Sequence, residues 1–455
     1  RRGATCHLVP LNLQDREVPA LAPDYVLLNY FRLSNQPLAA RLVAAGIPFG
    51  VHDTEGGVWE NPDSYTELLW KDAGLRSRTA VVCMWGRALA DHVVAAGLLE
   101  SSQVAVTGCA RFDFYESSWR SVLNENGARR RGNSRILVNT NFSVSNPRFT
   151  TREQSIAYCH REYGWSLEAI RKVTDAEDEA IRGTLELVRD LSHDFPGAEI
   201  VLRPHPFEDP ALYREAVGAL PCVTVNDTGP VQPQIGAASV VIQRSCTTAI
   251  EAVAAGVPTL SPLWIPAPYL MPVAESVSVP CEGYPQMRAR LKEIFSGSWS
   301  PPAALSGAAE SAVSDWFFRI DGRAHTRVAN AIASGIAPRR AVDERLCRRY
   351  FYGVDREDLS VAARLGARLR RVFSLSPDFS FRQLREVPLT VWTKTSKHLD
   401  LGEARTLLER IGEAGRRQGE PGVDVAVARA RDRDDYLIPY EGQSLTVTAA
   451  GHSGA

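Results

Sequence analysis

The sequence lacks a long apolar run, and it lacks an excess of either charge. No uninterrupted apolar stretch in its 455 residues approaches the ~18–20 residues that a transmembrane helix needs, which excludes an integral membrane protein but not binding to a membrane surface. Lys and Arg number 52, Asp and Glu number 53, and the net charge is −1. Because no global basic field attracts polyanions, a nucleic-acid-binding function is disfavoured.

Close cysteine pairs and two common catalytic signatures are also absent. The eight cysteines are scattered, and none has a CxxC or similar spacing, which argues against a structural zinc site. In a chain of this length they indicate reduced, mostly buried thiols of a cytoplasmic protein. Neither a GxxxxGK[ST] phosphate loop nor a GxSxG nucleophile elbow occurs. The chain starts at Arg1 with no visible secretory signal, and we expect a first strand and helix to be missing upstream.

Short apolar strands alternate with helices along most of the chain, which predicts βαβ units with parallel sheets. Predicted strands of a first unit cover residues 4–9, 23–28, 47–51, 80–84 and 103–106. After a polar linker at 124–133, predicted strands of a second unit cover 135–139, 198–202, 222–225 and 239–242. We therefore predict an α/β protein with domains at 1–133 and 134–338, the second ending in helices over 303–335, and an appended, partly helical region at 339–455.

A loop with two carboxylates follows the predicted strand 47–51. Ligands of open parallel sheets bind outside the carboxyl ends of the strands, which is where Asp53 and Glu55 are expected. The following Gly56 and Gly57 let backbone approach a ligand closely. A carboxylate in this place can act as a general base for a sugar hydroxyl or as a nucleophile. A turn with solvated acids is the alternative.

A second candidate site lies in the loop that follows the predicted strand 103–106. Gly108 and Arg111 are expected to line a cleft between the two domains. An ion pair between Arg111 and Asp113 that simply closes the loop is an equally good interpretation.

The third candidate is the segment Arg203-Pro204-His205-Pro206 after the predicted strand 198–202. Its two prolines fix the backbone on either side of the histidine. A rigid His205 beside Arg203 suits a phosphate group, because one residue donates a proton or hydrogen bond and the other supplies charge. A loop histidine bonded only to backbone is the alternative.

Hydroxyl side chains open a predicted helix after the strand 239–242. Ser245, Thr247 and Thr248, together with free backbone N–H groups, make the start of this helix an anion site. Glu251 lies one turn further and is within reach of ribose hydroxyls. An ordinary helix cap with Glu251 as the capping partner is the alternative.

The order of these motifs resembles a GT-B glycosyltransferase. More narrowly, it is similar to bacterial surface-carbohydrate (capsule and lipopolysaccharide) biosynthesis enzymes of the sialyltransferase-like and Kdo-transferase-like kind, which use CMP-activated acidic sugars. Such sialyltransferases carry a D/E-D/E-G motif, an HP motif and a Ser-Ser/Thr motif. His205-Pro206 matches outright and Ser245-Cys246-Thr247-Thr248 loosely, whereas Thr54-Glu55-Gly56 departs at its first acid, which Asp53 supplies one residue earlier. The resemblance covers roughly residues 1–335.

The resemblance implies two Rossmann-like domains that face a central cleft. It implies that Glu55, or less favourably Asp53, deprotonates the acceptor, and that His205 stabilises the leaving phosphate. The nucleotide-binding residues that it implies are Arg203, Ser245, Thr247, Thr248 and Glu251. The expected ligands are a nucleotide sugar and a glycan or glycolipid acceptor, with no metal or other cofactor, because His, Arg and a helix terminus can carry the phosphate charge.

Other functions remain open at the level of sequence. A CDP-glycerol-type polyol-phosphate transferase shares the fold and phosphate-binding histidine loops. A sugar-nucleotide epimerase and a catalytically inactive GT-B scaffold for polysaccharide assembly are further alternatives. The many arginines of residues 339–455 can contact an anionic membrane surface, which would place the protein peripherally at the inner membrane, or they can form a solvated helical face.

Overall fold

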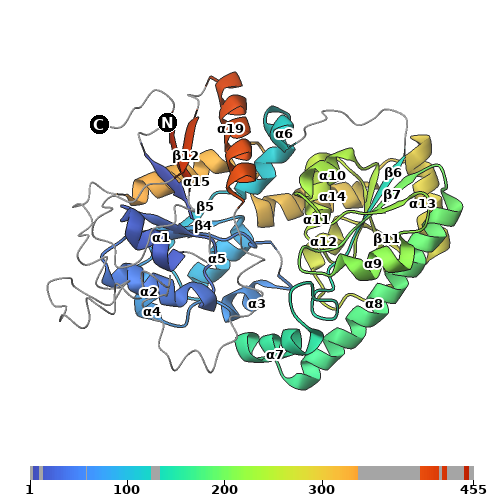
Figure 1. The fold of residues 1–455 in the computed structure, drawn as a ribbon, viewed down its shortest axis with the longest axis horizontal. Coiled ribbons are helices and arrows are strands. Elements are labelled where there is room, and N and C mark those ends of the chain that lie inside the picture. The colour runs from blue at the N-terminus through green and yellow to red at the C-terminus, as the bar shows by residue number, and fades with distance from the viewer. Residues whose placement is uncertain are drawn as a thin grey trace, which may run out of the picture.

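The computed structural model describes residues 4–9, 14–57, 59–123, 134–336, 400–419, 423–427 and 445–449. Within these residues the chain forms two α/β units that lie side by side (Figure 1). The linker expected at 124–133 and most of the region expected at 339–455 lie outside the described residues.

The first unit is built on a four-stranded parallel sheet with the strand order β2-β3-β4-β5. The strands are β2 (Val26–Leu28), β3 (Phe49–His52), β4 (Val82–Met84) and β5 (Val104–Val106). The helices are α1 (Gln14–Leu21), α2 (Gln36–Ala44), α3 (Pro62–Glu67), α4 (Ala73–Ser77), α5 (Arg87–Ala95) and α6 (Ser117–Leu123). A 3-10 segment, η4 (Ala110–Tyr115), follows β5 and leads toward the second unit.

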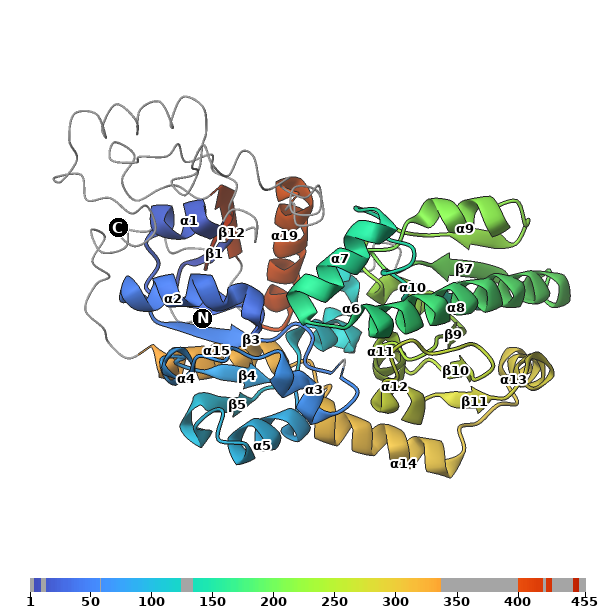
Figure 2. The same ribbon diagram turned by 90° about the horizontal axis from the view of Figure 1, so that it is seen from below.

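The second unit contains a six-stranded parallel sheet with the order β11-β10-β9-β6-β7-β8 (Figure 2). The strands are β6 (Arg135–Asn139), β7 (Glu199–Arg203), β8 (Val223–Val225), β9 (Val240–Ile242), β10 (Thr259–Pro262) and β11 (Val279–Cys281). The helices are α7 (Arg152–Tyr163), α8 (Leu167–Asp194), α9 (Pro210–Val217), α10 (Gln232–Ala237), α11 (Thr248–Ala255), α12 (Pro272–Ser276) and α13 (Tyr284–Ser296). The strand order reverses at β6, the position where open α/β sheets bind ligands.

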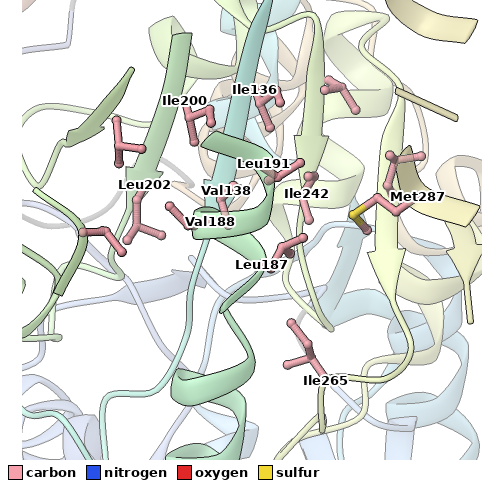
Figure 3. Close-up of a cluster of buried hydrophobic side chains, with 14 of the residues drawn as sticks. Ile136, Val138, Leu187, Val188, Leu191, Ile200, Leu202, Ile242, Ile265 and Met287 are labelled. Atoms are coloured by element: carbon pink, nitrogen blue, oxygen red, sulfur yellow. The ribbon is translucent and has the colours of Figure 1, made fainter. Parts of the chain in front are cut away.

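Helix α8 covers one face of this sheet. Its apolar residues recur at helical spacing, so Leu187 and Leu191 point the same way and pack on Ile136 and Val138 of β6 (Figure 3). The opposite face of β6 carries Leu137, which packs in a second buried cluster with Ala249 and Ile250 of α11. Successive residues of β6 therefore point alternately toward α8 and toward α11.

The expected α/β class is confirmed, since the chain has two Rossmann-like units, each built on a parallel sheet. The predicted strand at 135–139 has the bounds of β6, and the other predicted strands differ from the observed ones by one to three residues. Strand β11 was not predicted, and neither were helices α1, α3, α4, α6, α7, α9, α12 and α13.

The predicted strand at 4–9 was expected in the parallel sheet of the first unit but lies in a separate sheet. β1 (Cys6–Leu8) pairs antiparallel with β13 (Leu445–Ala449), and β13 pairs with β12 (Val423–Val427), so the two ends of the chain share a three-stranded sheet outside the parallel one. Helix α19 (Leu401–Arg417) packs on α6 of the first unit, with Ala414 buried against Trp119 and Val122.

The terminal helices also divide between the units. α14 (Ala303–Ala312) packs on α12 of the second unit, whereas α15 (Ala324–Gly335) returns to the first, where Val328 packs on Val81 and Cys83 (Figure 2). Asp113 of η4 holds the start of α15, because its carboxylate accepts hydrogen bonds from the amides of Ala324 and His325 at 3.0 and 2.8 Å. Among the described residues, no helix is long and apolar enough to span a membrane.

Candidate active site

The loops that follow β3 and β7 bring one carboxylate and one imidazole toward each other from the two units. Glu55 follows β3, and its carboxylate acts electrostatically on His205, which follows β7. The same carboxylate acts on Arg111 of η4. Both units thus contribute to the candidate site, whose central residues are Glu55, Arg111, His205 and Glu251.

Asp53 is the buried anchor of the β3 loop. Its side chain is 1% exposed, and its carboxylate accepts hydrogen bonds from the Glu55 amide at 2.8 Å and from the Tyr65 hydroxyl at 3.3 Å. Burial raises the pKa of Asp53 to about 6, with Arg32 acting in the opposite direction. Because Asp53 is buried, its carboxylate stabilises the loop and cannot contact a substrate. Glu55 is the acid of this loop that is open to an acceptor.

Glu55 is oriented by a residue that the sequence did not single out. Arg32 donates a hydrogen bond from Nη2 to Glu55 Oε2 at 2.6 Å, and the Tyr30 hydroxyl lies 3.5 Å from Oε1. The guanidinium of Arg32 also stacks 4.9 Å from the ring centres of Tyr30 and Trp59. Because 41% of the Glu55 side chain is exposed, the carboxylate is fixed in direction and still open to a substrate.

His205 is half-buried in a loop that Glu208 holds in place. The fully buried Glu208 carboxylate accepts hydrogen bonds from the His205 amide at 3.0 Å, from the Thr140 hydroxyl at 2.9 Å and from Tyr213. Nδ1 of His205 accepts from the Phe207 amide at 3.3 Å, which places the proton of the neutral ring on Nε2. Burial lowers the pKa of His205 to about 4, with Glu55 acting in the opposite direction, so the ring is a neutral donor near pH 7.

The guanidinium of Arg203 forms hydrogen bonds within the protein. It donates to the carbonyls of Thr228 and Gly229 at 2.9 and 2.5 Å and to Asn226 Oδ1 at 3.2 Å. The residue is 7% exposed, and burial lowers its pKa. These bonds give Arg203 the task of holding the loop between β8 and α10, which leaves it poorly placed to contact a phosphate directly.

Ser245 is likewise occupied. Its amide and hydroxyl both bond to Glu275 Oε1, at 2.6 and 2.8 Å, and Arg244 forms an ion pair with the same carboxylate at 2.8 Å. Ser261 donates to the other oxygen of Glu275 at 2.6 Å. Ser245 also has a positive φ of 52°, so this residue is a fixed corner between β9 and α11.

The two threonines at the start of α11 are less constrained. Thr247 is the N-cap of the helix and forms no side-chain cap. The Thr248 hydroxyl is buried beside the Cys246 thiol and has no other hydrogen-bond partner among the residues described. The amides of Ala249, Ile250 and Glu251 already donate to the carbonyls of Cys246 and Thr247. The first turn of α11 therefore keeps the Thr248 hydroxyl and the positive end of the helix dipole with which to attract an anion.

Glu251 joins the two units instead of facing open space. It is 3% exposed, accepts a hydrogen bond from the Tyr115 hydroxyl at 2.5 Å and lies 3.6 Å from Arg111 Nη2. Arg111 is 39% exposed and stacks on Trp85 and Phe112. Glu251 thus positions a partly open cation, which is a different role from the expected contact with ribose.

The three glycines proposed to line the site pack against protein. A Cβ at Gly56 would lie 2.9 Å from Trp85, and a Cβ at Gly57 would lie 2.6 Å from Phe317. Gly108 has a φ of 76° and faces Arg327 and Ala324 at 3.3 and 3.4 Å. Close packing of aromatic rings and of α15 therefore accounts for the absence of side chains at these positions.

Several residues of the site were missed at the level of sequence. Arg32 had a signal, since it lies four residues beyond a predicted strand, the same position that drew attention to Glu55. Glu208 and Glu275 had none, because each acts through partners that only the fold brings close. Across the described ranges, no three His, Cys, Asp or Glu residues converge as a metal site would require, and the expectation that no metal is needed stays a prediction.

No protein-family profile and no curated protein sequence matches the chain. Among solved structures, it is similar to MnaA of S. aureus determined with UDP, at 15% identity and a TM-score of 0.46, over 72% of this chain and 81% of that one. It is also similar to UDP-GlcNAc 2-epimerase of Neisseria meningitidis bound to UDP-GlcNAc (15% identity, TM-score 0.41, 70% and 79%). A third is the wall teichoic acid polymerase TagF (8% identity, TM-score 0.41, 71% and 92%). These similarities are too distant to assign an activity to this chain.

Proposed function

We propose that this protein is a glycosyltransferase that moves a sugar from a nucleotide donor to a glycan or glycolipid acceptor. One observation carries the proposal: the first unit presents an exposed carboxylate that Arg32 orients, Glu55, and the second presents an imidazole with its proton on Nε2, His205. A base on one side and a neutral hydrogen-bond donor on the other are the two groups that such a transfer needs.

Glu55 is the base in this proposal. Arg32 and Tyr30 fix the direction of its carboxylate, which leaves lone pairs for the proton of an acceptor hydroxyl. As that proton moves to Glu55, the hydroxyl oxygen attacks the anomeric carbon of the donor and the bond to the nucleotide phosphate breaks. Glu55 then releases the proton to solvent.

His205 and Arg111 stabilise the departing phosphate. The proton on His205 Nε2 forms a hydrogen bond to a phosphate oxygen without a change in the charge of the ring. Arg111, held by Glu251, supplies positive charge from the first unit. Thr247 and Thr248, at the positive end of the α11 dipole, complete the anion site, whereas Arg203 and Ser245 support the loops behind it.

The donor that we favour is a CMP-activated acidic sugar such as Kdo or sialic acid, and the acceptor a bacterial surface polysaccharide. The His205-Pro206 pair and the paired acids of the β3 loop support this choice. We propose that the protein works in the cytoplasm with peripheral contact at the inner membrane, because its products would be assembled there.

The test combines binding with catalysis. Thermal shifts of the full chain are measured with CMP, CDP, UMP, UDP and GDP, since a ligand of the folded state raises the melting temperature. Donor turnover with a glycan acceptor is then compared for wild type, Glu55→Gln and His205→Ala, with exposed Glu60→Gln and His193→Ala as matched controls. Loss of transfer in the first two variants alone is expected.

Other results would point elsewhere. Interconversion of a UDP-sugar without an acceptor would identify an epimerase, and transfer of glycerol phosphate would identify a polyol-phosphate transferase. A folded chain that binds none of the nucleotides would contradict the proposal and favour a scaffold.

A further inference from the structure

Asn139, the last residue of β6, has a buried side-chain amide that forms no hydrogen bond with the described residues. It is 8% exposed, and neither Oδ1 nor Nδ2 has a hydrogen-bond partner among the described residues. A buried amide left unpaired costs about 1–3 kcal/mol per group, so buried amides are normally paired. The equally buried Asn146 shows the usual case, because its Nδ2 donates to the Asp209 carbonyl at 2.9 Å.

Asn139 lies at the end of β6, between the strand that leads to His205 and the start of α11. Residues alternate between the faces of β6, so Asn139 shares a face with Leu137, which packs with Ala249 and Ile250 in the first turn of α11. Its register partner across the sheet is Arg203, two residues before His205. β6 is also the strand at which the order of the sheet reverses.

Other unpaired groups occur around the same loops. The Thr248 hydroxyl and Nε of Arg111 are buried without a hydrogen-bond acceptor or donor of the usual geometry in the described residues. Next to Asn139 in sequence, by contrast, the Thr140 hydroxyl is fully engaged with Glu208. Asn139 is therefore unpaired although its neighbour in sequence is fully bonded.

The Asn139 side chain has a hydrogen-bond donor, Nδ2, and an acceptor, Oδ1, so its ligand should offer both an acceptor and a donor. A phosphate oxygen can accept from Nδ2 but has no proton to donate to Oδ1. A sugar hydroxyl does both, and two neighbouring hydroxyls match both ends of the amide. Glu251, the residue first expected to meet ribose, is already paired with Tyr115 and Arg111.

We infer that Asn139 is a donor-binding residue that forms hydrogen bonds with hydroxyls of a sugar ring in the nucleotide donor. The inference rests on the proposed function and adds to it the residue that recognises the sugar. The ring is either the ribose or the transferred sugar, and both present the same hydroxyl chemistry.

The test is a comparison of Asn139→Leu with Asn146→Leu. Leucine has nearly the shape of asparagine but no polar atoms, so Asn139→Leu removes unpaired groups and is expected to raise the ligand-free melting temperature by about 2–4 °C. Asn146→Leu breaks an existing hydrogen bond and is expected to lower it. Affinity for the tightest-binding nucleotide or for CMP-sialic acid is expected to fall about 10- to 100-fold in Asn139→Leu only.

Binding of different ligands distinguishes a contact to the ribose from a contact to the transferred sugar. If the contact is to ribose, CMP and its 2′-deoxy analogue differ in wild type and bind alike in Asn139→Leu. If it is to the transferred sugar, CMP binding is unchanged and CMP-sialic acid binding is weakened.

Three results would overturn the inference. One is a lower melting temperature in Asn139→Leu, which would show that the amide serves folding. Another is wild-type affinity for every ligand in that variant. The third, wild-type protein that binds no nucleotide or nucleotide sugar, would refute the proposed function as well, and so is distinct from the first two.

Discussion

The Tyr115 hydroxyl of η4 donates a hydrogen bond to Glu251 Oε2 of α11 at 2.5 Å, and both side chains are buried. This bond ties the end of the first sheet to the start of the helix that the second unit offers to an anion. Together with the 3.6 Å contact between Arg111 and Glu251, it fixes the relative position of the two halves of the site.

Tyr115→Phe should therefore destabilise the protein by about 1–3 kcal/mol, because it leaves a buried carboxylate with one partner fewer. Urea unfolding measures this loss. An unchanged free energy of unfolding in Tyr115→Phe would show that the bond contributes little.

Arg32→Met should lower the rate of transfer about 10- to 100-fold with little change in donor affinity, because Glu55 loses the group that orients it. Arg32→Lys should recover only part of the rate, since a single ammonium cannot also stack on Tyr30 and Trp59. Steady-state kinetics test both, with exposed Arg78→Met as control. Equal rates for wild type and Arg32→Met would remove Arg32 from the site.

Part of this site could be predicted from the sequence, and the reason is local. The segments around Glu55, His205 and Thr248 each follow a short apolar strand, and parallel strands direct such loops to one edge of their sheet. Gly56 and Gly57 were conspicuous for the same reason, although Trp85 and Phe317 turned out to explain them.

The remainder depended on contacts that leave no local pattern. Tyr115 and Glu251 are 136 positions apart, and Ser245 and Glu275 are 30 apart. Whether a polar side chain faces a ligand or the protein is decided by such distant partners. For this reason the sequence could identify Arg203 and Ser245 as polar residues of the right loops but could not show that their bonds are already used.

Gly57→Ala should destabilise the protein by about 1–3 kcal/mol, because the new Cβ would lie 2.6 Å from the ring of Phe317. The double variant Gly57→Ala/Phe317→Leu should recover part of the loss, as the smaller side chain gives way. Gly197→Ala is the matched control, since no atom of the described residues lies within 4 Å of a Cβ added there. Thermal denaturation compares the set, and additive effects in the double variant would contradict the packing explanation.

Asp53 predicts a pH-dependent effect on stability. Its pKa is about 6 in the folded protein against an ordinary value of 3.8, so between these values the folded state holds a proton that the unfolded state lacks. The contribution of Asp53 to the free energy of unfolding therefore rises as the pH falls through 6. The stability lost in Asp53→Asn should be about 2 kcal/mol larger at pH 4.5 than at pH 7.5.

Unfolding at both pH values measures that difference, and Asp91→Asn on the exposed side of α5 controls for removal of a carboxylate. A loss that is equal at both pH values, or larger at pH 7.5, would show that Asp53 is not held in a desolvated position.

Ser245 and Thr248 should respond in opposite ways. The Ser245 hydroxyl donates to Glu275, whereas the Thr248 hydroxyl has only the Cys246 thiol beside it among the described residues. Ser245→Ala removes a bond to the Glu275 carboxylate, so it should lower the melting temperature while nucleotide affinity in the folded protein stays near that of wild type. Thr248→Val keeps the shape and deletes an unpaired hydroxyl, so it should leave or raise the melting temperature and weaken nucleotide binding about 5- to 20-fold. Melting curves and titrations with CMP and UDP decide the matter. The reverse pattern would return the phosphate to Ser245, as the sequence motif first suggested, and would require Glu275 to release that hydroxyl when the donor binds.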